Sequence, residues 1–347
     1  MKERNEAFDL LRGVAIAMVM IHHLHLGALP SWLRESWTGV DLFFVLSGYF
    51  VTKSFSGWID NPGAGATWRT RLGAAFRYIL RRMMRILPPA FLWAALSVLA
   101  AGFFNRGAGF GNPDQVWQEF LAVLRLDYNY FSVKTGFDKL GYYWSLAVEE
   151  HVYVVLPFFL IAVRRPAFRV IGFALVIVTC FALRWIAVDQ GASFSSLWYL
   201  THYRAETIAW GSLLAIWNFR GPKIPALFRP GLGLICLGYL WTAPSFLSKN
   251  QLGYFGFTTF AVVSALLMTL GANSEIGMRS RFVGAWATLG RRSYSLYLMH
   301  IPVWTLVTEI LGHGNLALSF LALGVLSEIH YRWVELPLIR LGQRWFF

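Results

Sequence analysis

The sequence predicts an all-α integral membrane protein with about ten transmembrane helices and with both termini in the cytoplasm. Of its 347 residues, 56% are hydrophobic and 14% are charged, whereas about a quarter of the residues in a soluble domain are charged. Apolar runs of about 20 residues, the length that crosses a bilayer, recur along the chain. No stretch has the composition of a separate soluble domain, so residues 1–347 are expected to form a single transmembrane domain.

The apolar runs place the transmembrane helices in order along the chain. The predicted spans lie at residues 9–29, 39–56, 87–105, 145–163, 167–188, 204–218, 230–246, 255–272, 289–311 and 314–336. The second and the sixth are short, so one of them could be partly re-entrant. Ahead of the third span, the pattern of Ile79, Leu80, Met83 and Met84 predicts a helix that lies on the inner membrane surface. Residues 106–141 are expected outside, where they could cover a site.

The positive charges set the predicted orientation. With a cytoplasmic N-terminus, 21 of the 31 Lys and Arg residues fall in inner loops and tails, and eight, including Arg184 and Arg204, fall in outer segments. This bias follows the positive-inside rule. The net charge of +13 therefore points to membrane lipid and not to nucleic acid as a partner. Cys180 and Cys236 lie inside apolar runs, so they are expected to pack there without a disulfide or a metal ion.

Arg12 and His23 mark the first span as a candidate site. Eleven helical residues turn through roughly 1100°, so both side chains lie on one stripe, roughly 16 Å apart along the axis. His22 lies about 80° to one side, and His25 is on nearly the opposite face. A cation and an imidazole aligned on a membrane helix are costly, which makes a functional role one hypothesis. A snorkelling Arg12 and an interfacial His23 are the structural alternative.

Two further spans begin with carboxylates in their outer halves. Asp41 opens the second span, either as a functional carboxylate or as a helix cap, and Ser47 interrupts that span either as a substrate contact or as a small packing residue. Glu149 and Glu150 enter the fourth span shortly after Ser145. Adjacent helical residues point about 100° apart, so at most one glutamate faces a given site. A buried glutamate suits acid–base work or the orientation of an imidazole.

Charged and polar stripes complete the set of candidates. Arg82 and Arg85, flanked by Arg81, project together from a helix and could bind phosphate, or they could simply be inner-surface positive charge. Arg204 and Glu206 are either site residues or an interfacial ion pair. In the last two spans, structural hydrogen bonding is favoured over catalysis for two stripes, Ser293, Tyr297 and His300, and Glu328, Arg332 and Glu335.

Taken together and in this order, these motifs resemble the acyltransferase-3 family of integral-membrane acyltransferases. The matching stretches are Arg12-x10-His23, Gly39–Gly48, Arg82-x-x-Arg85, Trp144–Glu150, Gly211–Ala215, Ser293–His300 and Glu335–Pro337. His151 departs from the pattern, because glutamine is more usual at that position. Some members carry an additional periplasmic domain, and none is expected in this chain, which ends at Phe347.

The resemblance implies transfer of an acyl group, usually acetyl, from acyl-CoA to a hydroxyl of a carbohydrate such as a lipid-linked or cell-surface glycan. Arg82, Arg85 and Arg81 would then bind the coenzyme A phosphates at the inner face, and its pantetheine arm would pass Arg12. His23 would be the general base or a nucleophile. Arg12 would bind the donor or fix the tautomer of His23, and Glu149 or Asp41 would orient the ring.

The remaining expectations complete this hypothesis. Ser47, Ser145, Glu150, Arg204, Glu206 and His300 are candidate substrate contacts. The protein would lie in the inner (plasma) membrane, and no metal cofactor is expected. The alternative function is a transporter or proton-coupled exporter, in which intramembrane His, Glu and Arg form a relay. The inverted repeats typical of transporters are not evident in the sequence.

Overall fold

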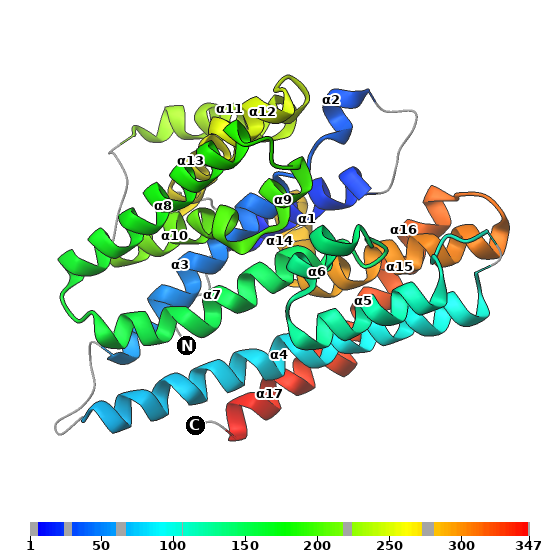
Figure 1. Cartoon of the computed structure of the whole chain (residues 1–347), viewed down its shortest axis with the longest axis horizontal. Coiled ribbons are helices and arrows are strands. Elements are labelled where there is room, and N and C mark those ends of the chain that lie inside the picture. Colours follow the sequence, from blue (N-terminus) through cyan, green and yellow to red (C-terminus); the bar gives the residue numbers. More distant parts are fainter. Residues whose placement is uncertain are drawn as a thin grey trace. The chain divides into compact units, whose positions relative to one another are not determined.

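The computed structural model describes residues 6–23, 30–59, 67–105, 107–217, 224–272 and 281–345. These residues are mostly helical and include no strand (Figure 1). The chain divides into two compact units, each built from separated segments. Unit 1 comprises Met1–Gly63 and Val155–Ser293, and unit 2 comprises Ala64–Val154 and Tyr294–Phe347. We describe each unit by itself.

The helices follow the apolar runs of the sequence. Unit 1 contains α1 (Glu6–His23), α2 (Ser31–Arg34), α3 (Gly39–Ile59), α8 (Pro166–Asp189), α9 (Phe194–Tyr199), α10 (Thr201–Trp217), α11 (Arg229–Thr242), α12 (Lys249–Gln251), α13 (Phe257–Ala272) and α14 (Arg281–Arg291). Unit 2 contains α4 (Trp68–Phe103), α5 (Pro113–Arg125), α6 (Tyr128–Thr135), α16 (Leu316–His330) and α17 (Leu336–Trp345). The unit boundaries fall within α7 (Tyr143–Ala162) and at the start of α15 (Ser293–Leu311).

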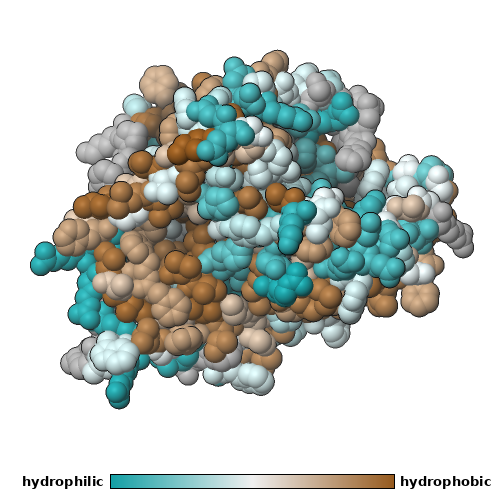
Figure 2. All heavy atoms as spheres, viewed as in Figure 1, coloured by the Kyte–Doolittle hydropathy of each residue, from teal (hydrophilic) through white to brown (hydrophobic). Residues whose placement is uncertain are grey.

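Within the described residues, four helical stretches are long and apolar enough to cross a membrane. They are Trp68–Phe103, Tyr143–Ala162, Pro166–Asp189 and Lys249–Ala272. Helix α8 also exposes Ile171, Leu175 and Val178, which are 52–62% accessible and recur every three or four residues. Figure 2 shows broad hydrophobic areas on the visible face. Exposed apolar stripes of this kind suit contact with lipid.

Helix α4 differs from the sequence prediction. A surface helix followed by a separate third span was expected, but a single helix of 36 residues runs from Trp68 to Phe103 (Figure 1). Pro88 and Pro89 lie inside it, where each lacks the N–H that would bond the carbonyl four residues earlier. The helix nevertheless continues, and it packs against α5 and α17 within unit 2.

The segment expected as an outer loop is also largely helical. Asn112 caps α5 by accepting hydrogen bonds from the backbone N–H groups of Asp114 and Gln115. The fully buried Glu119 of α5 then accepts from the hydroxyl of Tyr128 at 2.7 Å and from the backbone N–H of Leu140 at 2.7 Å. This carboxylate therefore ties α5, α6 and the approach to α7 together.

Two close helix crossings organise unit 1. A Cβ added to Gly48 of α3 would overlap the carbonyl oxygen of Ile208, and one added to Gly211 of α10 would overlap that of Val45. Gly13 and Gly290 allow a similar approach of α1 and α14. Small residues let membrane helices pack backbone to backbone, so these glycines fix the positions of α1, α3 and α10.

Candidate active site

The predicted site residues are divided between the two units. Those in unit 1 are Arg12, His23, Asp41, Ser47, Arg204 and Glu206, and those in unit 2 are Arg81, Arg82, Arg85, Ser145, Glu149, Glu150 and His300. The contacts within each unit show which of these residues the fold brings together.

His23 is the last residue of α1, and its ring is held by the helix itself. Its Nδ1 lies 3.0 Å from the carbonyl oxygen of Val19. A carbonyl only accepts hydrogen bonds, so a neutral His23 carries its proton on Nδ1 and its lone pair on Nε2. The contact with Val19 therefore leaves Nε2 as the ring nitrogen that can accept a proton.

His22 has the same tautomer, because its Nδ1 lies 3.0 Å from the carbonyl oxygen of Arg34. The His22 and His23 rings are in edge contact, with centroids 5.0 Å apart. The tautomer therefore does not show which of the two histidines is the candidate base. The choice of His23 rests on its helical phase relative to Arg12 and on the family pattern. His25 lies outside the described residues.

Arg12 belongs to a charge cluster near the start of α1. Its NH1 lies 3.5 Å from Asp9 Oδ1, and its guanidinium lies over the ring of Phe50 at 4.7 Å. Arg291 of α14 approaches the other oxygen of Asp9 at 4.0 Å. The side chain of Arg12 is 30% exposed while Asp9 is buried, so Arg12 is oriented by Asp9 yet accessible to an anionic ligand.

Asp41 and Arg204 form a fully buried ion pair between α3 and α10. Asp41 Oδ1 accepts a hydrogen bond from Arg204 NH2 at 2.8 Å, and both side chains have no exposed surface. The guanidinium of Arg204 also lies 4.3 Å from the centroid of the Phe257 ring. This contact gives Asp41 a structural partner in unit 1.

Arg204 and Glu206, predicted to be either site residues or an interfacial ion pair, belong to two pairs that each cross between helices. Residues two apart on a helix point about 200° from each other, and Arg204 and Glu206 form their ion pairs with different helices. Glu206 pairs with Arg184 of α8 at 2.7 Å, and both are fully buried. Thr258 of α13 accepts a hydrogen bond from Arg184 at 2.6 Å and donates one to Glu206 at 3.1 Å. Arg184 is thus fully buried in the interior of unit 1.

Ser47 occupies a tightly packed stretch of α3. Its neighbour Gly48 meets α10 directly, and the hydroxyl of Ser212 in α10 donates to the carbonyls of Ile208 and Gly48, at 3.1 and 3.4 Å. These contacts favour the packing interpretation of this stretch.

In unit 2, Arg82 and Arg85 share a helix but have different partners. The guanidinium of Arg82 lies 3.7 Å from the centroid of the Tyr153 ring, and its buried Nε has no hydrogen-bond partner among the described residues. Arg85 NH2 lies 3.6 Å from Glu335 Oε1, and its side chain is 49% exposed. Arg85 is therefore the more accessible cation for a phosphate, with Arg81 beside it on α4.

The paired glutamates have opposite surroundings. Glu149 is half-buried and accepts a hydrogen bond from the Tyr153 hydroxyl at 2.7 Å, which links it to the ring beneath Arg82. Glu150 is 1% exposed, and neither of its carboxylate oxygens has a hydrogen-bond partner among the described residues. A buried carboxylate without hydrogen bonds is costly when ionised, so Glu149 is the glutamate better placed to remain ionised.

Ser145 and His300 belong to one hydrogen-bonded cluster of α7 and α15. The Tyr297 hydroxyl donates to the carbonyl of Tyr142, so Ser145 must donate to the Tyr297 oxygen, 2.7 Å away. The fully buried His300 donates from Nδ1 to the Tyr297 carbonyl at 2.6 Å. This agrees with the structural hydrogen bonding expected for this stripe.

The second stripe is broken by a π-helical turn, Tyr331–Glu335, which follows α16. An inserted residue of this kind changes the helical phase. Arg332 pairs with Glu328, whereas Glu335 accepts from the Ser295 hydroxyl at 3.0 Å and faces Arg85. Glu335 therefore has partners on other helices, separate from the Glu328–Arg332 pair, and its contact with Ser295 agrees with the structural hydrogen bonding expected for this stripe.

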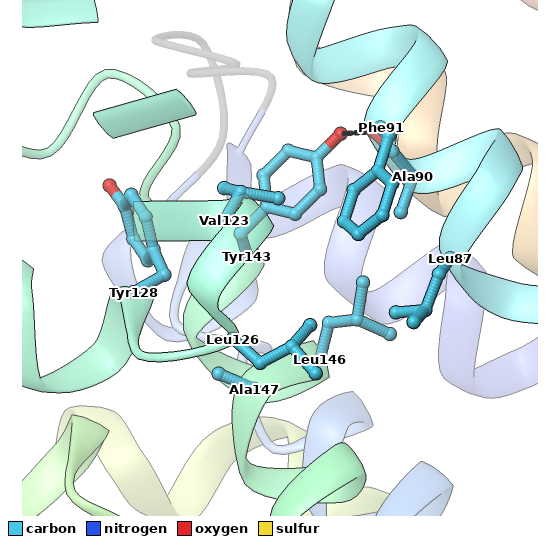
Figure 3. A pocket seen from close by; sticks show the side chains of 9 residues that line it. All are labelled: Leu87, Ala90, Phe91, Val123, Leu126, Tyr128, Tyr143, Leu146 and Ala147. Atoms are coloured by element: carbon cyan, nitrogen blue, oxygen red, sulfur yellow. Dashed lines mark hydrogen bonds between the residues drawn. The ribbon is translucent and has the colours of Figure 1, made fainter. Parts of the chain in front are cut away.

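A small apolar cavity lies among α4, α5 and α7 in unit 2 (Figure 3). Leu87, Phe91 and Leu146 are among its lining side chains, and the Tyr143 hydroxyl donates to the Ala90 carbonyl at 2.7 Å. Its volume of about 10 Å³ is roughly what one water molecule needs, so the cavity as it stands does not accommodate a coenzyme. Within the described ranges, no group of three or more His, Cys, Asp and Glu residues could hold a metal ion.

The sequence profile of the acyltransferase domain matches residues 5–327. The chain belongs to the acyltransferase-3 family. Among curated relatives, it is 27% identical to the peptidoglycan O-acetyltransferase OatA of Listeria monocytogenes, over 97% of this chain and 56% of the relative. It is 26% identical to YrhL of Bacillus subtilis, named as a candidate peptidoglycan O-acetyltransferase, over 97% of this chain and 55% of the relative.

A third relative, SACOL0978 of Staphylococcus aureus, is named as a candidate O-acetyltransferase and is 24% identical over 96% of this chain and 57% of that protein. The chain thus spans just over half the length of these relatives of the acyltransferase-3 family. No solved structure matches the chain significantly.

Four residues of this acyltransferase-family protein were not selected from the sequence, although three contact a candidate directly and His330 does so through Ser295. Asp9 pairs with Arg12, and Arg184 pairs with Glu206. Ser295 and His330 join Glu335, because His330 Nδ1 lies 2.9 Å from the Ser295 hydroxyl. A polar residue inside an apolar run was the available signal in each case, but its partner lies on another helix and only the fold reveals it.

Proposed function

We propose that this protein is an integral-membrane O-acyltransferase that transfers an acetyl group from acetyl-CoA to a hydroxyl of a cell-envelope carbohydrate. The observation that carries the proposal is the acyltransferase family match over residues 5–327. The relatives' names point to an O-acetyl product and to peptidoglycan as the acceptor class. A transporter would not be expected to share this family.

The donor is proposed to bind through the arginines of α4. Arg85 is half-exposed and is held by Glu335, so it can offer a planar donor pair to a phosphate. Arg81 would add charge beside it. Arg82, stacked on Tyr153 and coupled electrostatically to Glu149 and Glu150, would contribute positive potential to the same region.

His23 is the proposed base or nucleophile. As a base, its Nε2 takes the proton of the acceptor hydroxyl while that oxygen attacks the thioester carbonyl. The C–S bond then breaks, and the leaving thiolate recovers the proton from His23. As a nucleophile, Nε2 would attack the thioester first and form an acyl-imidazole that the hydroxyl then cleaves. The hydrogen bond from Nδ1 to Val19 supports either role, because it leaves Nε2 with its lone pair.

The remaining candidates are assigned supporting roles. Arg12 would contact the donor, and Glu149 would balance charge. Asp41, Arg204 and Glu206 would hold α3 and α10 in place through their buried ion pairs. The protein is proposed to cross the plasma membrane about ten times with both termini in the cytoplasm, so that cytoplasmic donor serves an acceptor on the outer side.

The test is acetyl transfer by the purified protein in proteoliposomes that contain acetyl-CoA. Mass spectrometry should show an acetyl-sized increase on cell-wall glycan fragments supplied outside, together with release of free coenzyme A thiol. Thiol release that matches no acetylated glycan would contradict the carbohydrate acceptor. Absence of both products would contradict the transferase itself.

A further inference from the structure

Two buried polar atoms without partners lie on neighbouring rings of unit 2. Trp93 of α4 and His330 of α16 have ring centroids 6.1 Å apart. Among the described residues, neither Trp93 Nε1 nor His330 Nε2 has a hydrogen-bond partner, and His330 is only 5% exposed. Such groups are normally satisfied, because an unpaired buried polar atom is costly. A ligand that reached both atoms would satisfy them.

The hydrogen bonds around His330 define what each atom offers. Ser295 donates its one hydroxyl proton to Glu335 Oε2, 3.0 Å away. Its oxygen must then accept from His330 Nδ1, which lies 2.9 Å away. A neutral His330 therefore presents Nε2 as an acceptor, whereas the Trp93 indole N–H is a donor. Together, the two rings offer one donor and one acceptor to a ligand.

The same chain of contacts leads to the proposed donor site. Ser295 joins His330 to Glu335, and Glu335 Oε1 lies 3.6 Å from Arg85 NH2. Arg85 and Trp93 are eight residues apart on α4, which is about 12 Å along a helix. The rings thus lie further along the helix that carries the phosphate-binding arginines.

We propose that Trp93 and His330 bind amide groups in the pantetheine arm of the acyl-CoA donor. The inference rests on the proposed function, because it takes acyl-CoA as the donor. An amide supplies both a carbonyl for the Trp93 N–H and an N–H for His330 Nε2. Ionised phosphate offers acceptors only, and a hydrocarbon chain offers neither group. In coenzyme A, the amides lie between the diphosphate and the thiol, so an arm that starts at Arg85 brings them to this part of α4.

The test compares two ligands on purified full-length protein by calorimetry. Coenzyme A contains the arm, and adenosine 3′,5′-bisphosphate contains phosphates without it. Trp93→Phe removes the N–H and keeps an aromatic ring. His330→Asn keeps a donor toward Ser295 and removes the Nε2 acceptor. Each should weaken coenzyme A binding about two- to ten-fold, the effect of one neutral hydrogen bond, and leave adenosine bisphosphate binding unchanged.

Matched controls are available in unit 2. Trp117 is 49% exposed, and His313 is also exposed, so Trp117→Phe and His313→Asn should bind both ligands like the parent. Arg85→Lys should weaken both ligands. Unchanged coenzyme A affinity in Trp93→Phe and His330→Asn would overturn this inference alone, as would an equal loss for both ligands. A parent that binds neither ligand would overturn the donor assignment and this inference with it.

Discussion

At the scale of single residues, Asp41 and Arg204 show how strongly a buried charge depends on its partner. Both are fully buried, and their ion pair joins α3 to α10. Asp41→Ala leaves the Arg204 charge uncompensated, so we expect a loss of about 3–5 kcal/mol in the free energy of unfolding. Thermal or denaturant unfolding in detergent measures it.

An exposed ion pair provides the control for that experiment. Arg332 is 66% exposed and pairs with Glu328, so Arg332→Ala should cost less than about 1 kcal/mol. Removing both buried charges with Asp41→Leu and Arg204→Met should recover part of the loss. If Asp41→Ala were as stable as the parent, the claim that Asp41 compensates the buried charge of Arg204 would be contradicted.

Arg85 provides the prediction for donor binding. Replacing it with Lys loses the planar guanidinium but keeps the charge. The lost charged hydrogen bonding is worth about 1.5–3 kcal/mol, so acetyl-CoA affinity should fall roughly ten- to hundred-fold by calorimetry. Arg77→Lys is the matched control, because Arg77 is exposed on the same helix. If Arg85→Lys and Arg77→Lys bound acetyl-CoA with equal affinity, Arg85 would contribute only to the general positive charge of the inner surface.

At the scale of helices, the crossing of α3 and α10 gives a sharp prediction. Gly48→Ala should destabilise the protein by about 1–3 kcal/mol, because its methyl group would overlap the Ile208 carbonyl. Gly57→Ala is the control, since Gly57 lies in the same helix with no atom near its Cβ position. That change should be neutral or stabilising by up to about 1 kcal/mol. If both variants unfolded alike, the close crossing would be contradicted.

Helix positions were predictable from apolar runs, but helix continuity was not. The second span begins at Gly39 in both the sequence prediction and the structure. Pro88 and Pro89 resemble a helix boundary, yet packing against neighbouring helices carries α4 through them. The phase of Glu335 was also unpredictable, because periodicity assumes a regular helix and the π-helical turn breaks it.

At the scale of the whole molecule, the membrane topology is the property that most of the proposed function depends on. Arg69, exposed near the start of α4, is predicted inside, and Lys134, exposed at the end of α6, is predicted outside. In a background that lacks Cys180 and Cys236, Lys134→Cys in intact cells should react with an impermeant thiol reagent, and Arg69→Cys should not. The reverse labelling would contradict the orientation.

The sequence named most of the charged groups at the candidate site but not their partners. Asp41 and Arg204 are 163 positions apart, and no periodic pattern connects residues on separate helices. Arg12 and His23 were found because both lie on one helix, where spacing alone fixes their relation. Asp9 and His330 were overlooked because their roles depend on contacts with other residues.

The most direct measurement is acetyl transfer by His23→Ala and His22→Ala in proteoliposomes, with folding checked for each. Loss of a general base typically lowers the rate about 10²- to 10⁴-fold, so His23→Ala should lose activity to that extent. His22→Ala should remain near the parent rate, because His22 lies off the stripe that joins Arg12 to His23. A well-folded His23→Ala protein that transfers acetyl groups at the parent rate would contradict the proposed mechanism.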